Sequence, residues 1–540
     1  MNYGFIIDNR KCIGCHACTV ACKSEHDVAI GVNRTWVKYV EKGAYPNTRR
    51  LFSVMRCNHC EDAPCVDICP VEALHTRDDG IVDFDNRRCI GCKSCMQACP
   101  YDALYIDPYT NTAAKCNYCA HRIDIGLEPA CVNVCPEHAI ISGDMDNPET
   151  EIAQLLSREQ VKVRKPEKGT QPKLYYIDAD EASLNPGHTQ NADSYMWSSQ
   201  SSGVGHYAKY AESLVAQKSP VDMYKELANI QEMPEKVIVH GDNSIRKPEG
   251  IFKRTIRRAY DAPSKGVLWG WEVSAYVLTK ALAAGGVLLP ILALMLGIPM
   301  SNTLLYTGLI TGLVALGLTG ALLVKDLDKP TRFAYVLLRP QWNSWLVRGG
   351  YSITAFGGLV TLWLAARYLG WHGVETPAMW GSALFGLVVA VYTAFLFAQA
   401  KGRDFWQSPA LILHMLTHPF VAGGAFFVLL APFIAADASW NAFVHTALLA
   451  AIVFNMLIIF TELTVTHPTE DAKKAAHIIS TGRYAPLFWM GVVLLGNLLP
   501  LIMLLWAPPF FASVAAVMIL IGLYITEHLW VRVPQLIPLS

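Results

Sequence analysis

The chain has 540 residues, of which 52% are hydrophobic and 17% charged, and its formal net charge is zero. Soluble proteins carry roughly 25% charged residues, so the composition does not fit a wholly soluble protein. The balanced charge gives no argument for nucleic acid, and we expect no nucleic-acid partner. All sixteen cysteines lie between Cys12 and Cys135, whereas the long apolar runs lie almost entirely after residue 266. The sequence therefore predicts a cysteine-rich domain at 1–200, a linker at 201–266 and a membrane domain at 267–535.

The N-terminal sequence M-N-Y-G-F-I-I-D-N-R-K has neither an apolar signal region nor a twin arginine. We therefore expect the cysteine-rich domain in the cytoplasm, where disulfides are disfavoured and clustered cysteines more often bind metals or redox centres. Residues 12–16 read C-I-G-C-H, which matches the attachment pattern of a c-type haem. Haem of this type is normally attached after export, so the location argues against it.

The cysteines fall into four groups of four, and every group begins C-x-x-C and ends C-x-x-x-C. The groups are Cys12, Cys15, Cys18, Cys22; Cys57, Cys60, Cys65, Cys69; Cys89, Cys92, Cys95, Cys99; and Cys116, Cys119, Cys131, Cys135. The first and third show the bacterial ferredoxin spacing C-x2-C-x2-C-x3-C, in which the fourth cysteine binds the other cluster of a pair. Four groups of four thiolates predict four [4Fe–4S] clusters, and such an array conducts electrons one at a time.

Zinc and haem are the alternatives for these cysteines. Zinc accounts for a lone C-x-x-C pair but not for the third cysteine of C-x2-C-x2-C-x3-C. Haem accounts for Cys12 to His16, but in the third group Lys93 stands at the position of His16 while the cysteine pattern is unchanged. We therefore favour iron–sulfur clusters and expect His16, His59 and His121 to be ordinary loop residues near them.

Residues 1 to about 200 resemble the four-cluster iron–sulfur subunit of membrane-bound molybdopterin oxidoreductases, in the cysteine pattern and in K-P-E-K-G-T-Q-P-K-L-Y-Y-I (165–177). The resemblance implies an α+β ferredoxin-like domain in which group one pairs with group four and group two with group three. The implied ligand sets are Cys12, Cys15, Cys18, Cys135; Cys116, Cys119, Cys131, Cys22; Cys57, Cys60, Cys65, Cys99; and Cys89, Cys92, Cys95, Cys69.

Eight apolar runs are long enough to cross about 30 Å of hydrocarbon as helices and predict an all-α transmembrane bundle. They are 271–296, 304–324, 346–369, 378–400, 409–434, 440–465, 485–506 and 510–531. Loops on the side of the cysteine-rich domain, including K-R-T-I-R-R (253–258), hold sixteen lysines and arginines, whereas the far side holds only Arg367. By the positive-inside rule, the iron–sulfur domain lies on the cytoplasmic side of a bacterial or archaeal inner membrane.

The membrane half resembles the polysulfide reductase (NrfD-type) quinone-reactive anchor over its whole length. The motifs that carry the likeness are W-G-W-E-V-S-A-Y-V-L-T-K-A-L-A-A-G (269–285), D-L-D-K-P-T-R-F-A-Y-V-L-L-R-P (326–340) and Y-T-A-F-L-F-A-Q-A-K (392–401). The resemblance implies two four-helix bundles without haem. It also implies a site for menaquinone or ubiquinone near Glu272, Tyr276 and Tyr392, with Lys401 at the end of the fourth span. The alternative for the two tyrosines is an aromatic belt at the membrane interface.

Other ionisable residues lie deeper in the spans, where they are costly and often functional. They are Lys280, His414, His418, His445 and Glu462. A proton path, structural hydrogen bonds between helices and ligation of a b-type haem all remain open for them.

The sequence therefore predicts an electron-transfer and membrane-anchor subunit formed by fusion of two usually separate subunits. Electrons would pass between a molybdopterin-containing catalytic subunit and the quinone pool. No centre that converts the partner's substrate is visible in the sequence. The alternatives are an ion-translocating, quinone-linked module and a purely structural membrane anchor for the clusters.

Overall fold

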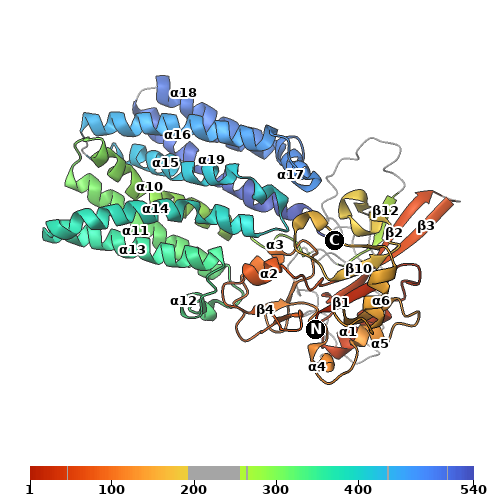
Figure 1. Ribbon diagram of the computed structural model, residues 1–540. Helices are drawn as coiled ribbons and strands as arrows, with labels where there is room; N and C mark the ends of the chain where they lie inside the picture. The colour runs from red at the N-terminus through yellow and green to blue at the C-terminus, as the bar shows by residue number, and fades with distance from the viewer. Residues whose placement is uncertain (45–46, 192–255, 263–264, 435–436, 507–508) are drawn as a thin grey trace, which may run out of the picture. The chain divides into compact units, whose positions relative to one another are not determined.

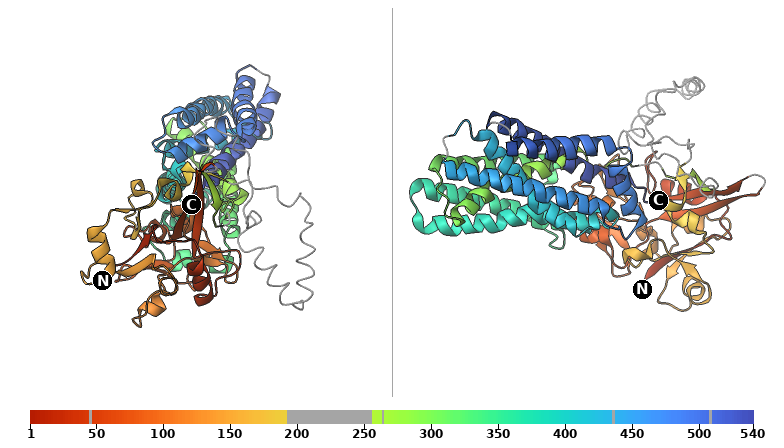
Figure 2. Two further views of the ribbon diagram at one scale, coloured as in Figure 1. Left: turned by 90° about the vertical axis from the view of Figure 1, so that its right-hand side faces the viewer. Right: turned by 90° about the horizontal axis from the view of Figure 1, so that it is seen from above.

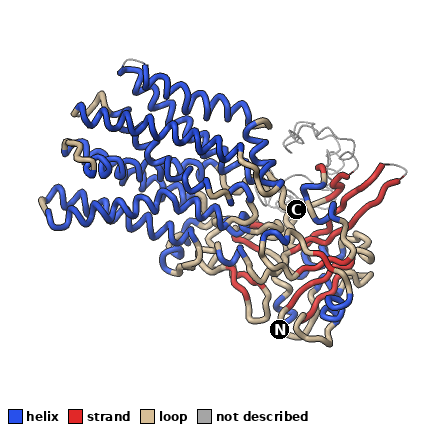
Figure 3. Tube along the Cα trace, turned by 45° about the horizontal axis from the view of Figure 1, so that its top comes forward, coloured by secondary structure: helices blue, strands red, loops and turns tan. Residues whose placement is uncertain are grey.

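The computed structural model describes residues 1–44, 47–191, 256–262, 265–434, 437–506 and 509–540 (Figure 1). The chain divides into two compact units, one of Met1–Leu268 with Pro538–Ser540 and one of Trp269–Ile537. Strands occur in the first unit, whereas helices make up the described part of the second (Figure 3). Most of the predicted linker, up to residue 255, lies outside the described residues.

The first unit is built on a four-stranded sheet in the order β8-β1-β10-β9. Its strands are β1 (Tyr3–Asp8), β8 (Ile140–Asp144), β10 (Leu174–Ile177) and β9 (Val161–Lys162). Strand β1 pairs in parallel with β10 and antiparallel with β8. Because side chains alternate along a strand, Phe5 and Ile7 belong to one apolar cluster and Ile6 to another. Helix α6 (Glu151–Arg158) covers the Ile6 face through Ile152.

A second sheet has the order β11-β12-β2-β3. It consists of the hairpin β2 (Thr35–Ala44) and β3 (Asn47–Arg56), with β12 (Ile256–Tyr260) on β2 and β11 (Gln190–Asn191) on β12. Strand β12 lies where the sequence placed a linker, and its arginine-rich composition concealed it. Arg257 forms an ion pair with Glu41, and the buried Arg258 lies 3.2 Å from Asp261. These two arginines thus have protein partners, whereas the sequence assigned them to a membrane surface.

Short helices carry or adjoin cysteines of the four groups, and short hairpins follow groups two and three. The helices are α1 (Ala17–Glu25), α2 (Pro64–Asp67), α3 (Ser94–Ala98), α4 (Ala120–Ile123) and α5 (Ala130–Asn133). The hairpins are β4 (Leu74–Thr76) with β5 (Val82–Phe84), and β6 (Tyr105–Asp107) with β7 (Thr112–Ala114). Helix α2 contains Cys65 of group two and hairpin β4–β5 comes after that group, just as α3 contains Cys95 of group three and hairpin β6–β7 comes after it. The chain therefore repeats one cysteine–helix–hairpin arrangement.

Among the described residues of the second unit, eight helical segments are long and apolar enough to span a membrane, as the sequence predicted. They are α10 (Trp271–Met295), α11 (Asn302–Lys325), α13 (Trp345–Leu369), α14 (His372–Gln399), α15 (Ala410–Leu430), α16 (Ala438–Thr464), Leu487–Trp506 and α19 (Pro509–Arg532). The seventh consists of a π-helical part, Leu487–Leu498, and α18 (Leu499–Trp506). Helix α14 begins six residues before the predicted span, because the prediction began after Pro377 and the helix continues through it.

Helices α10 and α15 are the most enclosed of the eight, and the long helices run roughly parallel (Figures 1 and 2). One apolar cluster joins α10 to α11, α13 and α14, and another joins α10 to α15, α16 and α19. At their contact, a Cβ on Gly285 would overlap the carbonyl oxygen of Pro419 and the backbone of Gly423. The absence of a side chain at Gly285 and Gly423 therefore lets the two central helices touch through their backbones.

Candidate functional site

The pairing of β1 with β8 brings the first and fourth cysteine groups together. Ile7 lies opposite Ile140 in this antiparallel pair. Cys12 follows Ile7 by five residues and Cys135 precedes Ile140 by five, so both leave the sheet at the same edge. The sheet thus joins cysteines that are more than 120 residues apart in the sequence.

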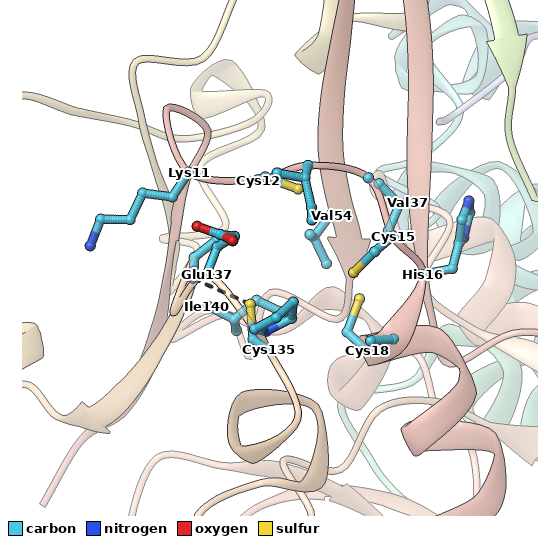
Figure 4. A pocket seen from close by; sticks show the side chains of 15 residues that line it. Lys11, Cys12, Cys15, His16, Cys18, Val37, Val54, Cys135, Glu137 and Ile140 are labelled. Carbon is cyan, nitrogen blue, oxygen red and sulfur yellow. Dashed lines mark hydrogen bonds between the residues drawn. The ribbon is translucent and has the colours of Figure 1, made fainter.

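The cysteines of the first implied set line one pocket at this edge (Figure 4). Cys12, Cys15 and Cys18 come from the loop after β1 and the start of α1, and Cys135 comes from the loop before β8. The empty space among the lining residues, together with the solvent at its open side, measures about 340 Å³. Figure 4 shows the sulfur atoms of all four cysteines around this common space.

Helix α1 connects the first set to the second. Cys18 and Cys22 lie four residues apart on α1 and are both buried. The thiol of Cys22 lies within electrostatic range of Cys116, Cys131 and Cys119, which is the rest of the second implied set. One helical turn therefore separates a thiol of one set from a thiol of the other.

Groups two and three exchange their fourth cysteines in the same manner. Cys65 lies within electrostatic range of Cys99, Cys57 and Cys60. Cys92 lies within the same range of Cys69 and Cys89. Cys95 lies within this range of Cys92, Cys89 and Cys69, and also of Cys65 from the neighbouring set. These neighbours are compatible with the four ligand sets that the resemblance implies, although some thiols also lie within electrostatic range of a neighbouring set, as Cys18 does of Cys131.

The surroundings of the thiols fit a bound anionic cluster. Backbone N–H groups donate to sulfur from Ala139 to Cys135 at 3.3 Å, from Ala73 to Cys69 at 3.3 Å and from Gly91 to Cys89 at 3.4 Å. Amide hydrogen bonds to cluster sulfurs are among the features that set cluster potential. Burial raises the pKa of Cys18, Cys92 and Cys119 to about 12, so a cationic group such as iron is required to hold them as thiolates.

The C-I-G-C loops adopt one backbone conformation in groups one and three. Gly14 and Gly91 have φ of 73° and 70°, and His16 and Lys93 both have φ of 61°. Left-handed residues in such loops turn successive N–H groups into a concavity that binds anions. Since histidine and lysine occupy the same left-handed position, His16 contributes a turn to this loop rather than a haem ligand.

Two buried cations lie among the thiols. The Nη1 atom of Arg56 donates to the sulfur of Cys131 at 3.1 Å, and the side chain is fully buried. Lys115 is also fully buried, and its Nζ atom donates to the carbonyl oxygens of Val82 and Cys116. The sequence analysis did not single out either residue, because nothing in the local sequence marks a cation for burial.

In the second unit, the structure brings two of the predicted quinone-site residues together. Tyr276 and Tyr392 are both 3% exposed, and Thr393 lies within hydrogen-bonding reach of both. They are therefore enclosed by helices, which disfavours the interfacial aromatic belt. The Nζ atom of Lys280 donates to Thr393 at 2.7 Å and to the carbonyl of Ala390 at 2.9 Å. Lys280 thus joins the tyrosines in one polar group between α10 and α14.

The other two predicted residues lie nearer the ends of their helices. Glu272 is in the first turn of α10, where its carboxylate lies 3.8 Å from the ammonium group of Lys325. Lys401 lies in the turn after α14 and is partly exposed. Both are on the side of the bundle from which α10 starts and at which α14 ends.

A second polar group lies between α15, α16 and α19. His414 Nδ1 lies 2.6 Å from Glu462 Oε2, and His418 Nδ1 bonds to Glu527 Oε1. Glu527 was missed in the sequence analysis, although a glutamate inside an apolar span was itself a signal.

The rings of His414 and His418 lie 4.4 Å apart on one helix, which leaves no room for a porphyrin between them. His445 lies elsewhere and bonds to the carbonyl of Leu504 at 2.9 Å, a contact between helices.

Three family models match this chain. The polysulphide reductase NrfD model matches residues 261–535, and two models of 4Fe-4S dicluster domains match residues 11–74 and 48–145. The NrfD match covers half of the chain, including all eight spans.

The relatives include subunits of several reductases. The B subunit of tetrathionate reductase from Salmonella typhimurium is 45% identical over 188 residues, which are 34% of this chain and 75% of the relative. The corresponding component of polysulfide reductase from Wolinella succinogenes is 42% identical over 180 residues, which are 32% of this chain and 93% of the relative. A putative dimethyl sulfoxide reductase iron–sulfur subunit from Halobacterium salinarum is 36% identical over 225 residues, 36% of this chain and 86% of the relative.

Proposed function

Because this chain belongs to the polysulphide reductase NrfD family and joins that membrane anchor to an electron-transferring iron–sulfur subunit, we propose that it carries electrons between a catalytic partner and membrane quinone through four [4Fe–4S] clusters. The observation that carries the proposal is the pocket at the edge of the central sheet, where Cys12, Cys15, Cys18 and Cys135 come together from the two ends of the cysteine-rich region. The polar group around Tyr276, Tyr392 and Lys280 supplies the site at the other end of the route.

Each cluster would draw three ligands from one cysteine group and the fourth from its partner group. The proposed sets are Cys12, Cys15, Cys18, Cys135; Cys22, Cys116, Cys119, Cys131; Cys57, Cys60, Cys65, Cys99; and Cys69, Cys89, Cys92, Cys95. When bound, the clusters supply reversible one-electron chemistry. The chain's part is to desolvate them, to donate backbone N–H groups to their sulfurs and to place Arg56 and Lys115 beside them.

Iron analysis and EPR of the whole chain test the cluster count. Four clusters with four irons each predict sixteen iron atoms per chain and four S = ½ signals after full reduction. Zinc in place of iron, or signals from only two clusters, would contradict the proposal. A [3Fe–4S] signal in freshly prepared protein would also contradict it, since every set has four thiols.

A quinone needs hydrogen-bond partners for its carbonyl oxygens, and the first turns of α10 and last turns of α14 provide them. The proposed partners are Glu272, Tyr276, Tyr392 and Lys401, and we add Lys280 because its Nζ atom donates to Thr393 and lies 5.0 Å from the ring centroid of Tyr392. Either menaquinone or ubiquinone has suitable carbonyls. A quinone-site inhibitor should block quinone-dependent reoxidation of the reduced clusters, whereas a purely structural anchor would show no such effect.

The catalytic partner is the remaining element of the proposal. The relatives include subunits of reductases named for tetrathionate, polysulfide and dimethyl sulfoxide, which are sulfur compounds, and one subunit of an arsenate respiratory reductase. We expect a molybdopterin-containing subunit that acts on a sulfur compound or another small redox substrate. Purification of the complex through this chain should recover that subunit with molybdenum bound, and recovery of the chain alone would count against it.

The chain is a multi-pass membrane protein. We propose that it lies in the bacterial or archaeal cytoplasmic membrane with its cysteine-rich unit on the cytoplasmic side, on the basis of the charge difference between its loops. Protease treatment of right-side-out vesicles should leave the cysteine-rich unit intact. Digestion of that unit from the outside would reverse the orientation.

A further inference from the structure

Two buried histidine–glutamate pairs lie close together inside the second unit. His414 and His418 are four residues apart on α15, and their ring centroids lie 4.4 Å apart. His414 bonds to Glu462 of α16, and His418 bonds to Glu527 of α19. The indole N–H of Trp530 donates to the same oxygen of Glu462 at 3.0 Å. Since all four ionisable side chains are at most 5% exposed, each pair is held away from lipid and water.

The pairs leave acceptor atoms without hydrogen-bond partners. Because the Nδ1 atoms of both histidines bond to carboxylates, their Nε2 atoms are the remaining ring nitrogens, and neither has a partner among the described residues. Glu527 Oε2 is also buried without a partner there. Unpaired polar atoms at this depth are costly. Water bound among them would donate hydrogen bonds to these atoms and would also carry a proton between them.

A positive charge faces the pairs from the neighbouring helix. The Lys280 ammonium of α10 lies within electrostatic range of Glu527, and its Nζ atom lies 5.0 Å from the ring centroid of Tyr392 of α14. Helices α10, α14, α16 and α19 all pack against α15. With Tyr392 and both histidines neutral, both glutamates ionised and Lys280 protonated, the group carries a charge of −1.

The charge sum favours a proton over a metal ion. Donor atoms of His414, His418 and Glu527 lie within 4.8 Å of one another, so a divalent cation is the competing occupant. A divalent ion would bring the group to +1 beside Lys280, whereas one proton brings it to zero. Burial of a net charge is unfavourable, and the neutral, singly protonated group is therefore the better fit.

The ionisable side chains lie at increasing depth, from one face of the bundle to its middle. Glu462 is two residues from the C-terminal end of α16, and His414 is the fifth residue of α15. At 1.5 Å per residue, Glu462 lies roughly 3 Å and His414 roughly 6 Å from those ends, whereas Lys280 lies roughly 14 Å into α10. His467, just beyond α16, lies within electrostatic range of Glu462. The series thus starts at the surface where α16 ends and stops near mid-membrane.

We propose that His414–Glu462 and His418–Glu527 form a proton relay that connects this surface to Lys280 and the quinone pocket. The relay rests on the proposed quinone function. Reduction of a quinone to a quinol takes up two electrons and two protons and forms two O–H bonds. The electrons come through the clusters one at a time, and the protons come along the relay from the side on which α10 begins. Oxidation of quinol sends both in the opposite direction.

The position of the relay distinguishes proton supply from ion translocation. The groups of the relay all lie in the half of the bundle nearest the start of α10. In the other half, the histidine that the sequence singled out, His445, bonds to a backbone carbonyl and lies outside this series. The described residues therefore support a route to the quinone from one side rather than a route across the membrane.

The test uses the full complex in proteoliposomes, with a short-chain menaquinone analogue and a pH-sensitive dye on each side. In the unaltered complex, reduced clusters should be reoxidised with uptake of two protons per quinone from the compartment that faces the start of α10. The changes His414→Gln and His418→Gln should each slow this proton uptake and the coupled reoxidation at least tenfold. Lower pH should partly restore the rate, while the quinone KM and the EPR spectra of the clusters stay unchanged.

His445→Gln is the matched control, because it removes a partly buried histidine of a membrane-spanning helix that lies outside the relay. Glu462→Gln and Glu527→Gln keep the side-chain shape and should act like the histidine changes if a histidine variant does not assemble. Failure of the unaltered complex to reoxidise its clusters with quinone would reject the proposed function itself. Normal reoxidation in every relay variant would reject the relay alone, as would zinc bound in the unaltered complex and lost in His418→Gln.

Discussion

Ile7 of β1 lies opposite Ile140 of β8, and this pairing places the first and fourth cysteine groups at one edge of the central sheet. Cys12 and Cys135 consequently line one pocket although 123 residues separate them in the sequence. A cluster bound there would connect the two ends of the cysteine-rich region. Its loss should therefore destabilise the sheet as well as interrupt electron flow.

The exchange of fourth cysteines gives the first prediction. Cys22→Ser should perturb the cluster of Cys116, Cys119 and Cys131 before that of Cys12, because Cys22 faces the former set. Cys135→Ser is the matched change and should perturb the cluster of Cys12 instead. EPR of the reduced full chain reports both. If Cys22→Ser removed only the Cys12 cluster signal, the proposed exchange would be incorrect.

Arg56 gives a prediction about cluster potential. Its buried guanidinium group donates to Cys131 and stabilises the more negative, reduced state of the adjacent cluster. Arg56→Gln should lower that cluster's potential by roughly 60 mV, the one-electron equivalent of about 1.4 kcal/mol. An EPR-monitored redox titration measures the shift. Arg77→Gln is the control, because Arg77 pairs with Asp79 and Asp124, and an equal shift in both variants would remove any specific role for Arg56.

Lys38 gives a prediction about stability. Its side chain is fully buried in β2, and its Nζ atom has no hydrogen-bond partner among the described residues. Burial, aided by the nearby Arg258, lowers the pKa of Lys38 well below its ordinary value. The folded state therefore binds fewer protons than the unfolded state between the lowered and the ordinary pKa, so stability should rise with pH across that window.

Lys38→Met should accordingly stabilise the chain by about 1–3 kcal/mol at neutral pH, since it removes an unpaired buried amine. The gain should shrink as pH rises toward the ordinary lysine pKa. Thermal unfolding of the full chain at several pH values measures both variants. A gain that did not change with pH would show that Lys38 is not held in its neutral form by folding.

Gly349 gives a prediction about the quinone pocket. A Cβ at this position of α13 would overlap the ring of Tyr392. Gly349→Ala should displace that ring, cost about 1–3 kcal/mol of stability through overpacking and raise the quinone KM. Gly358→Ala on the same helix is the control, because a Cβ there meets no neighbouring atom within 4 Å. Steady-state quinone reduction by the full complex measures the KM, and equal values in the two variants would argue against Tyr392 as a pocket residue.

Local patterns predicted the larger part of this molecule. Each transmembrane span is a continuous apolar run, so the eight spans could be read directly from the sequence. The C-x-x-C and C-x-x-x-C spacings similarly marked all sixteen thiols. Strand β12 could not be recognised in the same way, because its pairing with β2 joins segments more than 200 residues apart. The burial of Arg56, Lys115 and Lys280 also depends on long-range packing that no short pattern encodes.

The candidate quinone site was predicted only in part for the same reason. Tyr276 and Lys280 lie one turn apart on α10, and this spacing was visible in the sequence. Their approach to Thr393 depends on how α10 packs against α14, which the sequence pattern does not encode. The family resemblance indicated Tyr392 of α14 as a member of this site, but it did not indicate Lys280. Glu527 could have been singled out as a glutamate inside an apolar span, but its pairing with His418 became visible only when α19 was seen beside α15.

Transfer of electrons from the clusters to quinone is the central claim, and rapid mixing of the pre-reduced full complex with a menaquinone analogue tests it most directly. The unaltered complex should lose its reduced-cluster EPR signals as quinol forms. Tyr392→Phe should slow this loss at least tenfold, because the change removes a hydroxyl group that can donate to a quinone carbonyl. Clusters that stayed reduced in the unaltered complex in the presence of quinone would contradict the account.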